Sequence, residues 1–228
     1  MIVLQSIYLV RHGETAWSLT GQHTALTDLP LTARGERNAR RLGERLMNQA
    51  FAGVFTSPSQ RARRTCQLAG FASTAQVNRD LAEWNYGIFE GRRTKEIRSE
   101  YPDWQLFRHG CPGGESPEQV AARAGDVLNQ IRAIKGDALI FSSGHFLRVV
   151  AARWLGLEPA VGKFLALSTA SLSVIGYEHN SSQPAIRMWN DTSHLEDEAI
   201  DELTFESHAA IAEPRPQSPA RQQMTLRT

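Results

Sequence analysis

The stretch YLVRHGETAW, residues 8–17, indicates how the N-terminal half folds. It also raises the question of why an arginine and a histidine directly follow an apolar strand. An apolar run rich in β-branched and aromatic residues reaches Arg11 and His12 directly, and a glycine and a glutamate follow. Such a run is typical of a buried central strand in a parallel sheet. A strand that merely turns at the surface has no need of a guanidinium beside an imidazole. The stretch therefore predicts an anion-binding site at the end of the strand.

Further along the chain, strand patterns alternate with helix patterns, and the alternation favours a three-layer α/β/α sandwich with a largely parallel central sheet. After the first strand, over residues 2–10, further strands are expected at residues 54–56, 74–79, 137–143, 171–177 and 185–189. Helices are expected after the N-cap Thr32, after the N-cap Ser57 with Pro58 at the first position, around residues 120–131, and from Gly144 to Gly156. Residues 17–31 lack any helical period and are predicted to form a long loop.

Composition sets the broad class of the protein. Residues 1–195 are predicted to form one domain, and residues 196–228, acidic and then proline-containing, a disordered tail. The net charge of +1, from 25 basic and 24 acidic residues, gives no reason to expect a nucleic-acid or membrane partner. Two cysteines make no disulfide framework, and the first ten residues lack the features of a signal peptide, so a cytoplasmic protein is expected. Since no zinc-ligand spacing occurs, neither a metal nor a cofactor is predicted.

Four cationic or imidazole side chains are expected at one edge of the sheet. Arg11 and His12 follow the first strand, Arg61 follows the second, and His145 follows the strand at residues 137–143. Ligands of parallel α/β sheets bind outside the carboxyl ends of the strands. Arg61 and His145 also fall at predicted helix N-termini, which attract anions. The convergence predicts a phosphate pocket.

These residue types suit phosphoryl transfer. Arginine grips two phosphate oxygens with a fork that never loses its charge. Inside such a cage, the neutral imidazole of His12 can attack phosphorus, with its other nitrogen held by a backbone carbonyl near Gly13. His145 would then stabilise the transferring group. Glu83, among the apolar residues of LAEWNYG, is a candidate to protonate the leaving group.

The motifs RHGET, TSPSQRARRT, LAEWNYGIFEG and SSGHFLR, in that order, resemble those of the histidine phosphatase superfamily, the phosphoglycerate-mutase-like enzymes. The resemblance covers roughly residues 3–190. It implies that His12 is the phosphorylated nucleophile, that Glu83 is the proton donor, and that three side chains bind the phosphoryl group: Arg11, Arg61 and His145. The resemblance is compatible with either a monomer or a homodimer.

The loop WSLTGQHTALTDLPLT is similar to the substrate loop of the sugar-phosphatase branch, which includes sedoheptulose-bisphosphatase-like proteins. In that branch, Ser18, His23 and Thr24 match positions that contact substrate, and Tyr86 is a further candidate. The chain departs from many relatives at two positions, with serine in place of asparagine at residue 18 and in place of histidine at residue 143.

Three functions are compatible with this pattern. The first is a phosphatase of small phosphorylated metabolites such as sugar phosphates or bisphosphates, acting through a phosphohistidine. The second is a phosphoglycerate-type phosphomutase, which the chain disfavours because only residues 84–112 separate Glu83 from GGES and the long insert of the cofactor-dependent mutases is missing. The third is a non-catalytic module that binds phosphorylated ligands.

Overall fold

The computed structural model describes residues 4–195, so the predicted tail at residues 196–228 lies outside the described residues. Six strands form one sheet: β1 (Ile7–Arg11), β2 (Gly53–Thr56), β3 (Ala75–Val77), β4 (Ala138–Ser142), β5 (Leu172–Tyr177) and β6 (Pro184–Asp191). The longer helices are α2 (Ala33–Leu46), α3 (Gln60–Leu68), α6 (Pro117–Arg132) and α7 (Gly144–Trp154). Shorter helices are α1 (Ala16–Thr20), α4 (Thr94–Glu100) and α5 (Leu106–His109). No helix within residues 4–195 is long and apolar enough to cross a bilayer.

The strand order is β3-β2-β4-β1-β5-β6. The pairs β2·β3, β2·β4 and β1·β4 are parallel, whereas β5 runs antiparallel to both β1 and β6. The prediction of a largely parallel central sheet is confirmed. β1 and β4, the two central strands, are the strands that the sequence places directly before Arg11–His12 and His145.

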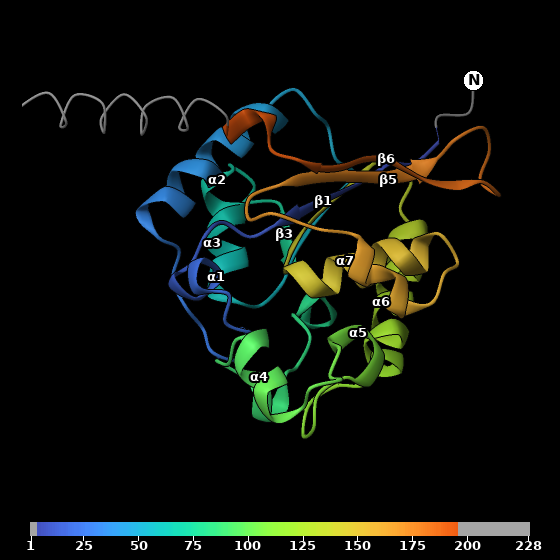
Figure 1. Cartoon of the computed structure of the whole chain (residues 1–228). Helices are drawn as coiled ribbons and strands as arrows, with labels where there is room; N and C mark the ends of the chain where they lie inside the picture. The colour runs from blue at the N-terminus through green and yellow to red at the C-terminus, as the bar shows by residue number, and fades with distance from the viewer. Residues whose placement is uncertain (1–3, 196–228) are drawn as a thin grey trace, which may run out of the picture. The chain divides into compact units, whose positions relative to one another are not determined.

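Helices cover both faces of the sheet, as Figure 1 shows for α2 and α3 on one side and α6 and α7 on the other. Alternate side chains of β1 point to opposite faces of the sheet. Ile7 and Leu9 belong to the core with α6 and α7, and Val10 belongs to the core with α2 and α3. The period of two along a strand thus builds two hydrophobic cores from one apolar run.

The start of α3 differs from the prediction. Ser57 does not cap the helix, because its backbone N–H donates to Phe141 O (2.9 Å) and so continues the sheet. The helix begins at Gln60, with Ser59 at the N-cap position, and the N–H of Gln60 donates to Asp28 Oδ1 (2.7 Å). Arg61 nevertheless lies in the first turn, as expected.

The predicted loop at residues 17–31 contains part of a helix, α1. Thr15 and Ser18 form a capping box at its start, and Gly21 ends it with a φ of 75°. Five residues are too few to show a helical period, so the hydrophobic pattern carries no signal for this element. The N-cap prediction for α2 is confirmed, since Thr32 Oγ1 accepts from Gly35 N (3.0 Å).

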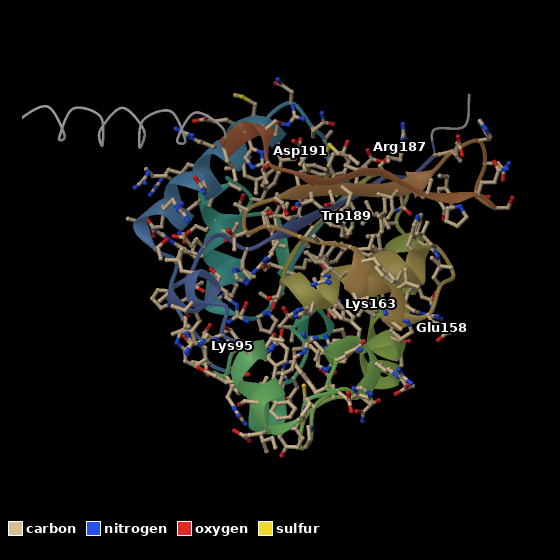
Figure 2. All side chains as sticks on the ribbon, viewed as in Figure 1. Lys95, Glu158, Lys163, Arg187, Trp189 and Asp191 are labelled. Atoms are coloured by element: carbon tan, nitrogen blue, oxygen red, sulfur yellow. The ribbon has the colours of Figure 1, made fainter. Side chains whose placement is uncertain are left out.

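A turn between η3 (Pro159–Phe164) and β5 touches the end of β1. Two β6 residues labelled in Figure 2 make side-chain contacts in this region. Trp189 Nε1 donates to Ala166 O of the turn (2.7 Å), and Asp191 pairs with Arg45 of α2 (3.1 Å). Ala170 adopts a left-handed φ of 55°, and its N–H donates to the carbonyls of Arg11 and His12 (both 3.1 Å). This unusual backbone is therefore part of what holds the strand end.

Candidate active site

The carboxyl ends of β1, β2 and β4 lie in register. Arg11 pairs with Ser142, and Thr56 pairs with Phe141, so the chain leaves all three strands at the same edge. His12 and the N-terminus of α7 meet there, as the parallel arrangement predicts. His12 is only 5% exposed.

A cavity of about 250 Å³ opens at this edge. Eight of the predicted site residues line it: Arg11, His12, Ser18, His23, Thr24, Glu83, Tyr86 and His145. The ninth, Arg61, is fully buried and does not line the cavity, although its charge still acts on His12. The structure therefore brings together residues that lie up to 134 positions apart in the chain, from Arg11 at the end of β1 to His145 in α7 (145 minus 11).

The two ring nitrogens of His12 have different surroundings. Nδ1 lies 2.8 Å from Gly13 O, and since a carbonyl can only accept, Nδ1 carries the proton. Nε2 therefore keeps its lone pair. Burial, followed by the charges of Arg61 and Arg11, lowers the pKa of His12 well below 6.5. The ring is therefore neutral at neutral pH.

Gly13 lets two backbone segments approach closely. A Cβ at this position would lie 2.6 Å from Gly35 O, at the start of α2. The N–H of Gly13 donates to Thr65 Oγ1 of α3 (2.9 Å). The close approach thus requires a glycine here, and the backbone next to His12 lies against α2 and α3.

Buried polar atoms without a partner gather around the strand ends. Arg11 donates through Nη1 to Leu167 O, and Arg61 donates to the carbonyls of residues 24, 25 and 27. The Nε atoms of both arginines and the Oγ of Ser143 have no hydrogen-bond partner among the described residues. Buried donors of this kind call for an explanation, and phosphoryl oxygens are the acceptors that a guanidinium fits best.

The carboxylate of Glu83 is held at the start of α7. Oε1 accepts from Trp84 N (2.9 Å) and Phe146 N (2.8 Å), and Oε2 accepts from His145 N (3.0 Å). The sequence suggested an apolar setting, but backbone N–H groups are the nearest partners. Oε2 has one such partner, and Glu83 lines the cavity.

His145 is oriented by Tyr86, whose hydroxyl lies 2.6 Å from Nδ1. Burial raises the pKa of Tyr86 well above 10 and lowers the pKa of His145 well below 6.5, so the phenol is protonated and the imidazole neutral. With Tyr86 donating to Nδ1, the ring proton lies on Nε2, where it can be donated to a phosphoryl oxygen.

The predicted substrate contacts lie on the cavity wall, and their roles stay predictions. Ser18 uses its hydroxyl in the α1 cap, donating to Thr15 O (2.9 Å) and accepting from Thr15 N (2.9 Å). The ring of His23 lies 3.3 Å from Thr94 Oγ1, and burial lowers the pKa of His23 to about 4. Thr24 donates to Gln22 O (3.1 Å).

Arg148 is a cavity residue that the sequence reasoning missed. It lies three positions after His145 on α7, and therefore about one turn further along the helix. Its Nε donates to Gly162 O (2.7 Å) and its Nη2 to Lys163 O (2.9 Å). The i, i+3 spacing in HFLR is the signal that could have indicated it.

The model of the histidine phosphatase superfamily (branch 1) matches residues 7–192. The chain belongs to the histidine phosphatase superfamily. Phosphatases of this superfamily are hydrolytic enzymes that need no metal. In the part of the chain that the structure describes, no group of three or more His, Cys, Asp or Glu side chains could hold a metal ion.

Curated superfamily members are similar over most of the chain. An acid phosphatase of Mycobacterium tuberculosis is 41% identical over 184 residues, covering 79% of this chain and 90% of the relative. Sedoheptulose 1,7-bisphosphatase of Saccharomyces cerevisiae is 37% identical, covering 65% and 67%. A probable phosphoglycerate mutase of Yersinia enterocolitica is 31% identical, covering 86% and 98%.

A solved structure confirms the fold of this superfamily member. The product of an open reading frame of Mycobacterium tuberculosis superimposes with a TM-score of 0.77 at 38% identity, over 82% of this chain and 97% of that protein. The α/β fold with helices on both faces of the sheet is therefore shared with a superfamily member of known structure.

Proposed function

We propose that this chain is a phosphatase that hydrolyses small phosphorylated metabolites through a phosphohistidine on His12. The observation that carries the proposal is the free Nε2 of a neutral His12 beside buried donors that lack partners. Superfamily membership and the identity to an acid phosphatase support it.

The proposed reaction has two steps. In the first, Nε2 of His12 bonds to phosphorus, the bond from phosphorus to the ester oxygen breaks, and Glu83 supplies the proton to the leaving alkoxide. In the second, water attacks phosphorus, Glu83 takes its proton, and the P–N bond breaks to release phosphate. Arg11, Arg61 and His145 would stabilise the negative charge on the phosphoryl oxygens in both steps.

Sugar phosphates or bisphosphates are the proposed substrates. Arg148 adds a guanidinium to the cavity beyond the two proposed for the phosphoryl group, and it would suit a second anionic group of the substrate. The yeast relative, named for a sugar bisphosphate, supports this class. The cytoplasmic location and the homodimer remain predictions.

The test combines phosphate release with trapping. Purified protein is screened against sugar phosphates, bisphosphates, nucleotides and phosphopeptides, and enzyme mixed with labelled substrate is quenched and digested. We expect label on histidine, absent in His12→Ala. Label on serine, or no phosphate release at all, would refute the proposal.

Two other outcomes of the same screen have defined meanings. Isomerised product that forms faster than free phosphate would assign the chain to the phosphomutases. The similarity to the probable phosphoglycerate mutase is the reason to test for this product. Turnover near zero with measurable binding of inorganic phosphate would indicate a binding module.

A further inference from the structure

Glu90, outside the predicted site, binds the backbone of the loop that carries His23 and Thr24. It follows η2 (Gly87–Phe89) and is half-buried. Oε1 accepts from Ala25 N (2.9 Å) and Thr27 N (3.0 Å), and Oε2 accepts from Ala25 N (3.1 Å). One carboxylate thus satisfies two backbone N–H groups in a segment without regular structure.

The carbonyls of the same segment are bound by Arg61. Its Nη2 donates to Thr24 O (3.0 Å) and Ala25 O (3.3 Å), and its Nη1 donates to Thr27 O (3.2 Å). Glu90 therefore accepts from the N–H groups of Ala25 and Thr27, and Arg61 donates to three of the four carbonyls of residues 24–27. We call this arrangement, residues 24–27 with Glu90 and Arg61, the loop clamp.

Apart from Ala25, which packs against the core, polar contacts hold this part of the loop. Leu26, at its centre, is 76% exposed. Next to the clamp, His23 N donates to Arg92 O (2.9 Å), and Gly91 N donates to His23 O (2.8 Å). The cavity wall formed by His23 and Thr24 is thus attached to the residues that follow Glu90.

We propose that Glu90 is a positioning residue for substrate binding. It fixes residues 24–27 so that His23 and Thr24 lie in the cavity wall. It also holds Arg61, which binds this loop through both Nη atoms and whose buried Nε has no hydrogen-bond partner among the described residues. Arg61 would then join the substrate loop to the phosphoryl pocket. The kinetic part of this inference depends on the proposed function, whereas the structural part does not.

Amide hydrogen exchange tests the structural part without any substrate. In Glu90→Ala, peptides that cover residues 22–28 should exchange at least about tenfold faster, since their N–H groups lose their acceptors, while α6 keeps its protection. Glu90→Gln keeps one acceptor oxygen and should fall between Ala and wild type. Glu44→Gln, at an exposed glutamate of α2, is the matched control and should match wild type. Unchanged exchange at residues 22–28 in Glu90→Ala would overturn the proposal.

Steady-state kinetics test the positioning role. We expect KM to rise about tenfold or more in Glu90→Ala, with a smaller change in kcat, partial recovery in Glu90→Gln, and no effect in Glu44→Gln. An active wild type with unchanged KM in Glu90→Ala would refute the positioning role and leave the proposed function intact. An inactive wild type would refute the proposed function, while the exchange result would still show whether Glu90 holds residues 24–27 in place.

Discussion

The two nitrogens of His12 are distinguished by a backbone carbonyl, and Tyr86 makes a corresponding distinction at His145. At His12, Nδ1–H donates to Gly13 O, and Nε2 keeps its lone pair. At His145, the Tyr86 hydroxyl occupies Nδ1 and leaves Nε2 as the donor. Two neutral imidazoles in one pocket can therefore have opposite roles, because each has one nitrogen committed to a different kind of partner.

Removal of the Tyr86 hydroxyl should impair the second imidazole. In Tyr86→Phe, His145 loses the group that selects its tautomer, and we expect kcat to fall about tenfold, which is about 1.4 kcal/mol of transition-state stabilisation. Tyr101→Phe, at an exposed tyrosine, is the control and should leave kcat unchanged. Steady-state rates of phosphate release measure both. Equal kcat in the two variants would show that the 2.6 Å contact has no catalytic consequence.

The junction between β1 and α2 depends on two glycines that allow backbone segments to touch. A Cβ at Gly35 would lie 2.3 Å from Glu14 O, and one at Gly13 would lie 2.6 Å from Gly35 O. No rearrangement of a flexible side chain can relieve these contacts, since the neighbouring atoms are backbone. The start of α2 is thus held directly against the segment that follows His12.

Gly35→Ala should destabilise the fold by about 1–3 kcal/mol, because overpacking forces the helix away from the strand end. The matched variant is Gly125→Ala in α6, where an added Cβ meets nothing within 4 Å. That substitution should stabilise by up to about 1 kcal/mol through helix propensity. Urea denaturation of both variants gives the comparison. If Gly35→Ala were as stable as Gly125→Ala, the close approach would not be a real constraint.

The elements and the site were predictable to different degrees, for a physical reason. Strand patterns and the Thr32 cap are local, so the five later strands and the cap were predicted to within about two residues. The first strand was predicted over residues 2–10, but β1 runs from Ile7 to Arg11, and residues 4–6 lie outside it. The start of α3 was misplaced because the N–H of Ser57 bonds to Phe141, a partner 84 positions away (141 minus 57) that no local pattern reveals. Likewise, the motifs placed His12 and His145 at one sheet edge, whereas the link from Glu90 to Ala25 and Thr27 leaves no trace in spacing.

Burial of neutral histidines should make the stability of the whole domain depend on pH. Burial lowers the pKa of His12 and His145 well below 6.5 and that of His23 to about 4. Between these values and 6.5 the unfolded chain binds more protons than the folded one, so stability is greatest above pH 6.5 and is lost as the pH falls toward 4.

The unfolding free energy should therefore decrease from pH 7 to pH 4. His23→Gln should remove the part of this decrease that His23 causes, which is about 3 kcal/mol for a pKa lowered from 6.5 to about 4. His179→Gln, at an exposed histidine, should leave the pH dependence as in wild type. Denaturation curves collected across this pH range provide the measurement. A wild-type stability that is flat between pH 7 and 4 would contradict the burial of neutral rings.

The most direct test of the proposed chemistry is to identify the nitrogen that carries phosphate in the trapped enzyme. Phosphoenzyme formed with substrate, denatured in alkali and examined by ³¹P NMR and peptide mapping, distinguishes Nε2-phosphohistidine from Nδ1-phosphohistidine. We expect phosphate on Nε2 of His12. Phosphate on Nδ1 of His12, or on another residue, would contradict it.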